Sequence, residues 1–208
     1  MSTNCRPAAV AGAFYPESPG ELTRTISALL RKVPDWIEPL PKAVIAPHAG
    51  YIYSGPIAAR AFAPLAGLSK SIRRVVLLGP THRVAVRGLA LPTSDAFATP
   101  LGKVPIDRQA ADSIGNMPQV LYSDAAHAQE HSLEVEIPFL QMVLGDFALL
   151  PLAVGDASPE AVAEVLARLW GGEETLIVVS SDLSHYLPYE DARQIDAKTA
   201  RQILALDP

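Results

Sequence analysis

The chain of 208 residues contains a single cysteine, Cys5, so it cannot form an internal disulfide bond. This is typical of proteins from a reducing compartment. Residues 1–16 hold no long apolar segment of the kind that a secretory signal needs. No apolar run approaches the roughly 20 residues of a membrane-spanning helix. We therefore expect a cytoplasmic protein with no membrane partner.

The chain is also poor in positive charge. Lysine and arginine total 17 against 22 aspartates and glutamates, which gives a net charge of −5, and no basic run is present. Nucleic acids and anionic membranes attract clustered basic side chains, so neither is expected as a partner. The glycines form neither a G-x-G-x-x-G motif nor a P-loop, and the sequence gives no support for nucleotide binding.

What the chain does contain is a series of short apolar segments separated by segments of helical character. Buried strands are expected at 42–46, 73–79, 147–154 and 175–181, and shorter strands at 88–91 and 97–104. Helices are expected at 18–33, 55–65, 107–114, 131–144, 158–170 and 188–206. Strands without polar alternation, separated by helices, indicate an α/β fold with a central, mostly parallel sheet and helices on both faces. We expect one domain, residues 1–208.

Three of the five histidines follow the ends of predicted apolar strands. His48 follows the strand at 42–46, His82 the strand at 73–79, and His185 the strand at 175–181. A lone histidine after a strand is usually an ordinary loop residue. In open α/β sheets, however, ligands bind at the carboxyl ends of the strands, and three such loops would bring three imidazoles to one edge if the strands are neighbours. Imidazole binds Fe, Zn, Cu and Ni, so a metal site is predicted.

Residues close to these histidines are candidates for further roles. Asp182 precedes His185 by three residues and could orient its ring or bind the metal; a helix cap is the ordinary alternative. Two histidines plus an anionic ligand are typical of non-haem Fe(II) oxygenases, and this set would leave a third histidine as acid or base. Tyr51 could bind a substrate hydroxyl, or it could simply pack.

A competing motif is formed by His127, Glu130 and His131, which spell H-x-x-E-H. On one helix, the two histidines would lie four residues apart and could share a zinc ion, as in zinc-dependent hydrolases. A second interpretation places Glu130 and His131 at the mouth of the main pocket, with Glu134 as a supporting acid. The ordinary alternative is an exposed helix start, where the helix dipole favours glutamate. Pro138 should kink or shorten the helix expected over 131–144.

Five short motifs resemble one family, in that family's order and across nearly the whole chain. They are AGAFYP at 11–16, APHAGY at 46–51, LGPTH at 78–82, EHSLE at 130–134 and SSDLSH at 180–185. The chain resembles the Memo family, also called AmmeMemoRadiSam system protein B. The resemblance implies a fold like the catalytic subunit of class III extradiol dioxygenases, in which two histidines and a carboxylate hold Fe(II) and a further histidine is the acid/base.

The resemblance assigns roles residue by residue. His48 and His82 match the two histidine ligands, and His185 matches the acid/base, with Asp182 beside it. Fe(II) is the metal it favours, with Cu or Zn as alternatives. The family carries a cysteine of a Cys-Gly motif in place of the carboxylate ligand, and Cys5 does not match it. We therefore expect the third ligand and the C-terminal part of the domain beyond Pro208, and an empty site is compatible with this sequence.

Three functions follow from these observations. The first is a metal-binding protein with a dioxygenase-like pocket, an oxidoreductase that acts on a small phenolic molecule. The second is a non-catalytic protein that binds a peptide or partner in the same pocket; for this, the resemblance implies AMME-domain and radical-SAM proteins as partners. The third is the zinc-dependent hydrolase built on the H-x-x-E-H motif.

Overall fold

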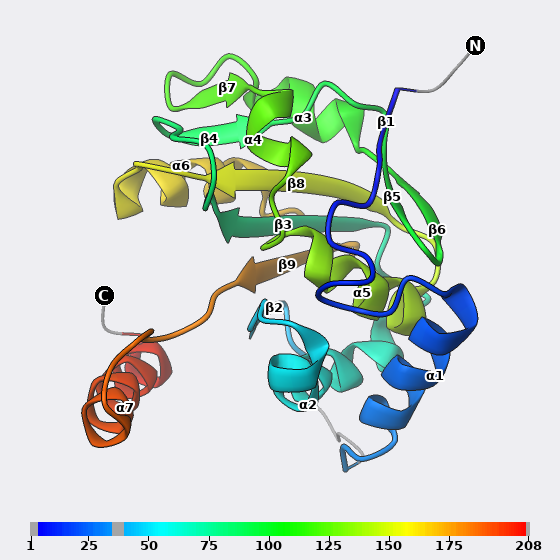
Figure 1. The fold of residues 1–208 in the computed structure, drawn as a ribbon. Helices are drawn as coiled ribbons and strands as arrows, with labels where there is room; N and C mark the ends of the chain where they lie inside the picture. The colour runs from blue at the N-terminus through cyan, green and yellow to red at the C-terminus, as the bar shows by residue number, and fades with distance from the viewer. Residues whose placement is uncertain (1–3, 35–39, 207–208) are drawn as a thin grey trace.

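The computed structural model describes residues 4–34 and 40–206, and a six-stranded sheet lies at its centre (Figure 1). Its strands, in spatial order, are β2 (Ala43–Ala46), β9 (Thr175–Ser180), β3 (Arg74–Pro80), β8 (Ala148–Val154), β4 (Leu89–Leu91) and β7 (Val120–Tyr122). The first four are mutually parallel, β4 is antiparallel to β8, and β7 is parallel to β4. The mostly parallel sheet expected from the sequence is confirmed.

Helices cover both faces of this sheet because successive residues of its central strands point in opposite directions. Along β3, Val75 and Leu77 belong to one buried cluster, whereas Val76 and Leu78 belong to the other. The first cluster includes residues of α1 (Pro19–Leu30), α2 (Tyr51–Phe62) and α5 (Ile137–Leu144). The second includes residues of α3 (Arg108–Ile114) and α6 (Pro159–Leu169). A strand buried on both faces needs apolar residues throughout, which explains the continuous apolar segments in the sequence.

A second, smaller sheet contains β1 (Cys5–Arg6), β5 (Ala96–Thr99) and β6 (Gly102–Pro105). β5 and β6 are antiparallel and account for the strands expected at 97–104, while β1 pairs in parallel with β5. β1 and β7 were not predicted, because segments of two and three residues are too short to show a periodic pattern.

The helix expected over 131–144 is wrong in its first half. The structure has a short helix, α4 (Asp124–Ala128), then a loop through His131, a 3-10 turn η2 (Glu134–Glu136), and only then α5. Pro138 lies in the first turn of α5, where its missing N–H costs no helical hydrogen bond. The helix is therefore shortened, as one of the two expected outcomes, and it is not kinked.

Two other helix starts also differ from expectation. α2 begins at Tyr51, four residues before the expected start, and runs into a 3-10 helix, η1 (Ala63–Leu68). α1 begins at Pro19, one residue after the expected start at Ser18, and the Ser18 side chain makes no capping hydrogen bond.

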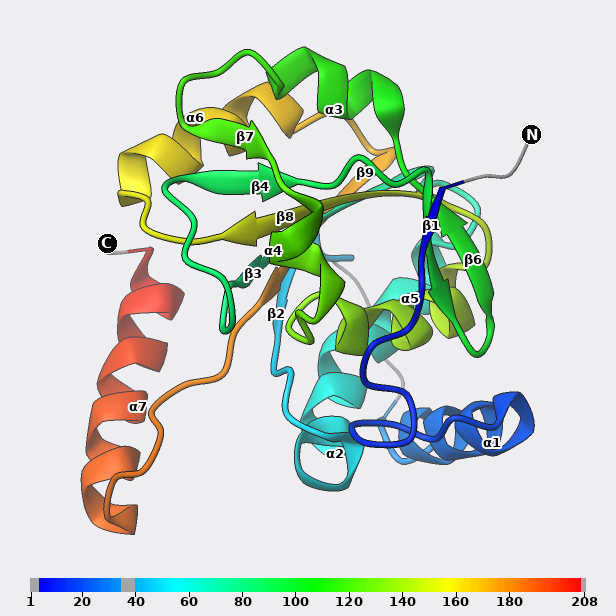
Figure 2. The ribbon, with the colours of Figure 1, turned by 45° about the horizontal axis from the view of Figure 1, so that its top comes forward.

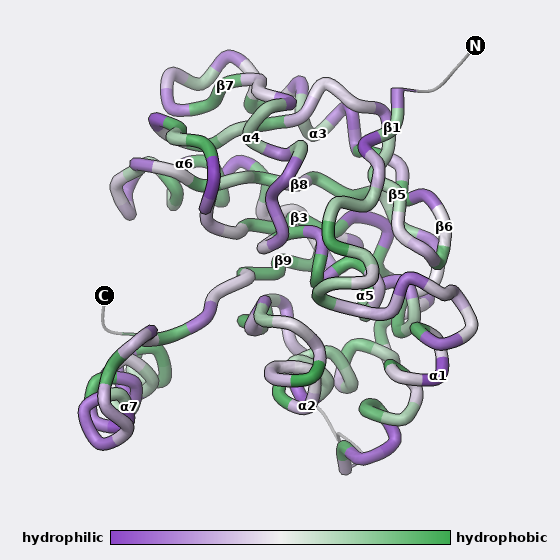
Figure 3. The backbone as a smooth tube through the Cα atoms, in the orientation of Figure 1, coloured by the Kyte–Doolittle hydropathy of each residue, from purple (hydrophilic) through white to green (hydrophobic). Residues whose placement is uncertain are grey.

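The last helix, α7 (Tyr189–Ala205), stands apart from the rest of the chain. Figures 1 and 2 show it from two directions at the end of an extended segment that follows β9. Both hydrophilic and hydrophobic residues line it (Figure 3), and none of its residues is buried. In the part of the chain that the structure describes, no helix is both long enough and apolar enough to cross a membrane.

Candidate metal centre

The carboxyl ends of β2 and β3 position His48 and His82. Each histidine lies two residues beyond the last residue of its strand, and β9 lies between the two strands. The strands that precede His48, His82 and His185 are therefore neighbours, as the prediction of a shared site required. The ring centroids of His48 and His82 are 5.3 Å apart.

A third imidazole, that of His131, completes the group. Its ring stacks on that of His82 with centroids 4.4 Å apart, and its centroid lies 5.6 Å from that of His48. One ring nitrogen from each of the three histidines lies within 4.8 Å of the other two. We call His48, His82 and His131 the histidine cluster. Three imidazole nitrogens at this spacing are a donor set that Fe, Zn, Cu or Ni can use.

His131 reaches the cluster because the loop that carries it packs closely on the end of β3. The Ser132 hydroxyl donates a hydrogen bond of 2.7 Å to the Pro80 carbonyl oxygen. A Cβ atom at Gly79 would lie only 2.9 Å from Ser132 Oγ, so a larger residue there would push the loop away. On the other side, Phe14 packs against the His131 ring, with centroids 4.7 Å apart.

Glu130 anchors both His82 and the loop. One carboxylate oxygen accepts hydrogen bonds from the His82 ring at Nδ1 and from the backbone N–H groups of His131 and Ser132; the other accepts the His82 backbone N–H. Burial alone would raise the pKa of Glu130, but these hydrogen bonds outweigh it and hold the pKa below its ordinary value. The ionised carboxylate fixes the proton of His82 on Nδ1, which leaves Nε2 as a ligand atom.

His48 is oriented in the same way by a different group. Its Nδ1 lies 2.8 Å from Ser180 Oγ, while its Nε2 is 3.8 Å from Asp182 Oδ2, too far for a hydrogen bond. Burial lowers the pKa of His48 to about 4; the Asp182 charge opposes this shift and the neighbouring imidazoles add to it. Burial also lowers the pKa of His131. Both rings are therefore uncharged at neutral pH, as metal binding requires.

Asp182 and His185 lie at the rim of the cluster. Asp182 Oδ1 accepts the backbone N–H of His48 at 2.8 Å, and its Oδ2 lies 3.6 Å from His185 Nε2. The His185 side chain is 57% exposed and does not contribute to the group of ring nitrogens. Asp182 is no helix cap, since α7 begins at Tyr189 with Pro188 as its N-cap. The structure thus brings His48 and His82 together, and it places His131 beside them, in agreement with the interpretation that put Glu130 and His131 at the mouth of the pocket. It leaves His185 outside this group.

Two other candidates from the sequence have structural partners instead of an open pocket. Tyr51 is buried; its hydroxyl donates to the Val135 carbonyl oxygen, and burial raises its pKa. Glu134 is buried in an ion pair with Arg6, with Oε2 2.6 Å from Nη1. The same carboxylate accepts hydrogen bonds from the backbone N–H groups of Ala9 and Val10 and from the Tyr15 hydroxyl. Glu134 therefore holds the N-terminal segment, from which Phe14 reaches the cluster.

Only the first half of the H-x-x-E-H motif lies on a helix. α4 ends at Ala128, and His131 lies in the following loop. The His127 ring points elsewhere: its Nε2 lies 3.0 Å from the Ala90 carbonyl oxygen and it packs edge-on against Phe97. His127 and His131 share no helix face, so the prediction of a helical zinc motif is wrong and the zinc-dependent hydrolase loses its geometric basis.

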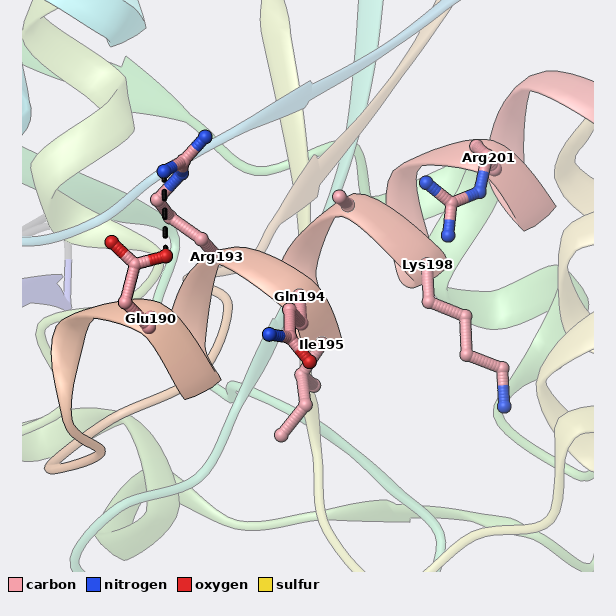
Figure 4. Close-up of a pocket in the computed structure, with 7 residues that line it drawn as sticks. Glu190, Arg193, Gln194, Ile195, Lys198 and Arg201 are labelled. Carbon is pink, nitrogen blue, oxygen red and sulfur yellow. Dashed lines mark hydrogen bonds and ion pairs between the residues drawn. The ribbon is translucent and has the colours of Figure 1, made fainter.

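A hollow elsewhere on the surface lies along α7 alone (Figure 4). The residues that line it are Glu190, Arg193, Gln194, Ile195, Ala197, Lys198 and Arg201. Its charged groups include an exposed pair, Arg193 and Glu190, with 3.4 Å between nitrogen and oxygen. All of these side chains belong to one helix without buried residues, and this hollow has none of the converging polar groups that mark the histidine cluster.

Residues outside the sequence-based candidates complete the centre. Ser180 and Glu136 lie behind His48, and Phe14 packs against His131. The signal for Glu136 was the pair of glutamates inside the apolar run LEVEIPFL, since charged residues within such a run must be buried with partners. Cys5 lies in β1 and takes no part in the cluster. Pro208 lies outside the described residues, and the expectation of a further ligand beyond it stays a prediction.

Comparison with known proteins identifies relatives along almost the whole chain. Residues 6–208 match the Memo-like protein family. A MEMO1 family protein of Methanopyrus kandleri is 39% identical over 220 residues, which cover 97% of this chain and 76% of the relative. Another, from Aquifex aeolicus, is 40% identical over 197 residues, covering 92% of this chain and 71% of the relative. A third, from Thermotoga petrophila, is 36% identical, covering 98% and 78%. The five motifs thus lie in a chain that belongs to the Memo-like protein family.

Proposed function

We propose that this chain binds Fe(II) through the histidine cluster and acts as a dioxygenase-like oxidoreductase. The observation that carries the proposal is the approach of three imidazole nitrogens to within 4.8 Å of one another. The hydrogen bonds behind two of the rings support it. Because Nδ1 of His48 and of His82 already has a partner, Nε2 of each ring is available as a ligand without rearrangement.

The residues around the cluster fit a divalent cation. Two carboxylates adjoin the imidazoles: Glu130 contacts His82, and Asp182 lies 3.8 Å from His48 Nε2. Their negative charge stabilises a cation beside the three rings. Imidazole with nearby carboxylate suits Fe and Zn, and the resemblance to class III extradiol dioxygenases favours Fe(II). When bound, Fe(II) would offer open coordination positions for a substrate and for O2.

The chain itself supplies an acid/base group at the rim. His185 is exposed to solvent, and its Nε2 lies 3.6 Å from Asp182 Oδ2, close to the carboxylate but beyond hydrogen-bond length. A histidine in this position can take the proton of a phenolic hydroxyl, and Asp182 would stabilise the resulting imidazolium. A small phenolic molecule is therefore the substrate class that we propose.

Anaerobic titration with Fe(II) tests the metal site. We expect one Fe(II) per wild-type chain. The variants H48A, H82A and H131A should lose more affinity than the 10- to 100-fold that changes outside the ligand shell typically cost. Unchanged binding in both H48A and H82A would sink the proposal. Wild-type binding in H131A would instead remove His131 from the ligand set and favour the predicted ligand beyond Pro208.

Oxygen consumption tests the reaction. Fe(II)-loaded protein given catechol-type substrates should take up O2, and H185N should slow this uptake while still binding the metal. Metal binding without any O2 uptake would contradict the oxidoreductase and favour recognition of a peptide or of an AMME-domain or radical-SAM partner. Pull-down with those partners would then measure the alternative directly.

A further inference from the structure

Three groups converge on one buried hydroxyl behind the histidine cluster. Ser180 Oγ lies 2.6 Å from the Ser132 carbonyl oxygen, 2.8 Å from Glu136 Oε1 and 2.8 Å from His48 Nδ1. Ser180 and Glu136 are almost completely buried. All three distances are those of hydrogen bonds, so each contact needs a proton on one side.

Counting protons restricts how these contacts can be made. The hydroxyl of Ser180 has one proton, and the Ser132 carbonyl oxygen can only accept. If the hydroxyl proton goes to Ser132, both other partners must donate to Ser180 Oγ: Glu136 as a protonated carboxylic acid, and His48 as the Nδ1–H tautomer. This arrangement satisfies all three contacts. An ionised Glu136 could only accept, and would then compete with Ser132 for the single proton.

The surroundings of Glu136 also favour the protonated form. No ion pair joins Glu136 to a basic residue in the described part of the chain, and its second oxygen, Oε2, is buried without a hydrogen-bond partner. Burial raises the pKa of Glu136 to about 8; the Ser180 hydrogen bond lowers it somewhat and the Asp182 charge raises it further. A carboxyl group in such a place is neutral at pH 7.

We propose that Glu136 is a positioning residue that, as a neutral acid, donates to Ser180 and thereby fixes the orientation and tautomer of His48. Ser180 then accepts the His48 Nδ1–H, and Nε2 is left for the metal. In its consequence for metal binding, this inference rests on the proposed function. The two ligands would then be oriented in different ways. An ionised carboxylate orients His82 directly, whereas two uncharged groups, Glu136 and Ser180, orient His48.

The tautomer can be measured without any metal. Long-range ¹H–¹⁵N NMR on histidine-labelled, metal-free protein at pH 7 should show His48 with its proton on Nδ1 in the wild type. S180A, which removes the acceptor, should give a mixture of tautomers. E136Q should keep the wild-type tautomer, because the glutamine amide is neutral and can donate to Ser180. S94A is the matched control, since Ser94 is a buried serine whose hydroxyl has no partner.

A second spectroscopic measurement reports on Glu136 itself. The infrared spectrum of the wild type at pH 7 should contain the carbonyl band of a buried protonated carboxyl group, and this band should be missing in E136Q. Fe(II) affinity should fall about 10- to 100-fold in S180A, the usual cost of losing such an orienting contact, and should be retained in E136Q and S94A.

Several results would overturn the inference. One is an Nε2–H tautomer of His48 in the wild type, and another is the absence of the protonated carboxyl band. The third is an E136Q protein whose His48 loses its Nδ1–H tautomer, or whose Fe(II) affinity falls, as much as in S180A. If S180A fails to fold, the infrared band of the protonated carboxyl group, present in the wild type and missing in E136Q, still decides. If the wild type binds no Fe(II), the proposed function fails, while the NMR and infrared results on metal-free protein still confirm or refute the role of Glu136.

Discussion

The histidine cluster and the segment that follows β9 lie at the same edge of the sheet but are built in opposite ways. His48 is 3% exposed while the His82 side chain is 39% exposed, and the rings of both have a hydrogen-bond partner behind them. Residues 181–188 and α7, which we call the β9 arm, carry His185 on an exposed side chain and a helix without buried residues. A metal site works best when its ligands are oriented before the metal arrives, whereas an acid/base group needs only to come within hydrogen-bond reach of the substrate.

Carboxylates show the same contrast. Glu130 and Glu134 are buried, and each accepts several hydrogen bonds from backbone N–H groups. On the β9 arm, Glu190 and Arg193 form a solvent-exposed ion pair, and such a pair contributes little to stability. Equivalent substitutions in the two regions should therefore have very different effects.

The largest effect is expected for E134A. This change leaves the Arg6 guanidinium buried without its partner and frees the N-terminal segment that carries Phe14. Loss of one member of a buried ion pair costs about 3–5 kcal/mol. Urea unfolding should show a loss of this size, whereas E190A on the β9 arm should stay within about 0.5 kcal/mol of wild type. Equal losses in the two variants would contradict the comparison.

The next effect is a pH dependence that comes from His127. Burial lowers its pKa from the ordinary 6.5 to about 4, so the folded state favours the neutral ring. The resulting stability is fully present above pH 6.5 and is lost as the pH falls from 6.5 towards 4, by about 3 kcal/mol at 1.36 kcal/mol per unit. The wild type should therefore lose more unfolding free energy between pH 7 and pH 4 than H127N does, and the two losses should differ by this amount.

H185N is the control for that measurement, because it removes a histidine without touching a buried site. The free energy of unfolding of both variants and of wild type should be measured in urea at each pH. An H127N protein that loses as much stability on acidification as the wild type would show that His127 is not held in its neutral form by burial.

The strand ends could be predicted from the sequence, and with them part of the site. His48 and His82 lie two residues beyond the ends of β2 and β3, and the residue in that position after β9 is Asp182. His185 lies three residues further on, where the chain has already left the sheet. All three histidines follow apolar strands in the sequence, but His185 follows its strand at a greater distance than His48 and His82 follow theirs.

His131 could not be placed in this way. Its position depends on Glu130. This carboxylate accepts hydrogen bonds from the N–H group of His82, 48 positions earlier in the sequence, and from those of the next two residues of its own loop. The segment also resembles a helix, and the packing of Ser132 against β3 at Gly79 adds to these hydrogen bonds in favouring a loop. Contacts between distant residues of this kind leave no periodic signal.

A smaller effect is expected for E130Q, which tests the role of Glu130 in the histidine cluster through metal binding. The glutamine amide can accept fewer of the N–H groups that the carboxylate holds, and it no longer fixes the His82 proton on Nδ1. We expect Fe(II) affinity to fall about 10- to 100-fold in anaerobic titration. E164Q is the matched control, since Glu164 is an exposed glutamate on α6 whose carboxylate accepts a hydrogen bond from the Gln119 side chain. Equal affinities of E130Q and E164Q would show that Glu130 does not prepare His82 for the metal.

The smallest effect on metal binding is expected for H185N, on the β9 arm. His185 touches the cluster only through Asp182, whose other oxygen is already bonded to the His48 backbone, so removing the imidazole leaves the ligand nitrogens where they are. Fe(II) affinity should therefore equal that of the wild type even where O2 uptake is slowed. An affinity loss as large as that of H82A would mean that the arm folds inward and that His185 binds the metal. The exposed arm and the buried cluster would then be one site, and the contrast between them would describe only the metal-free protein.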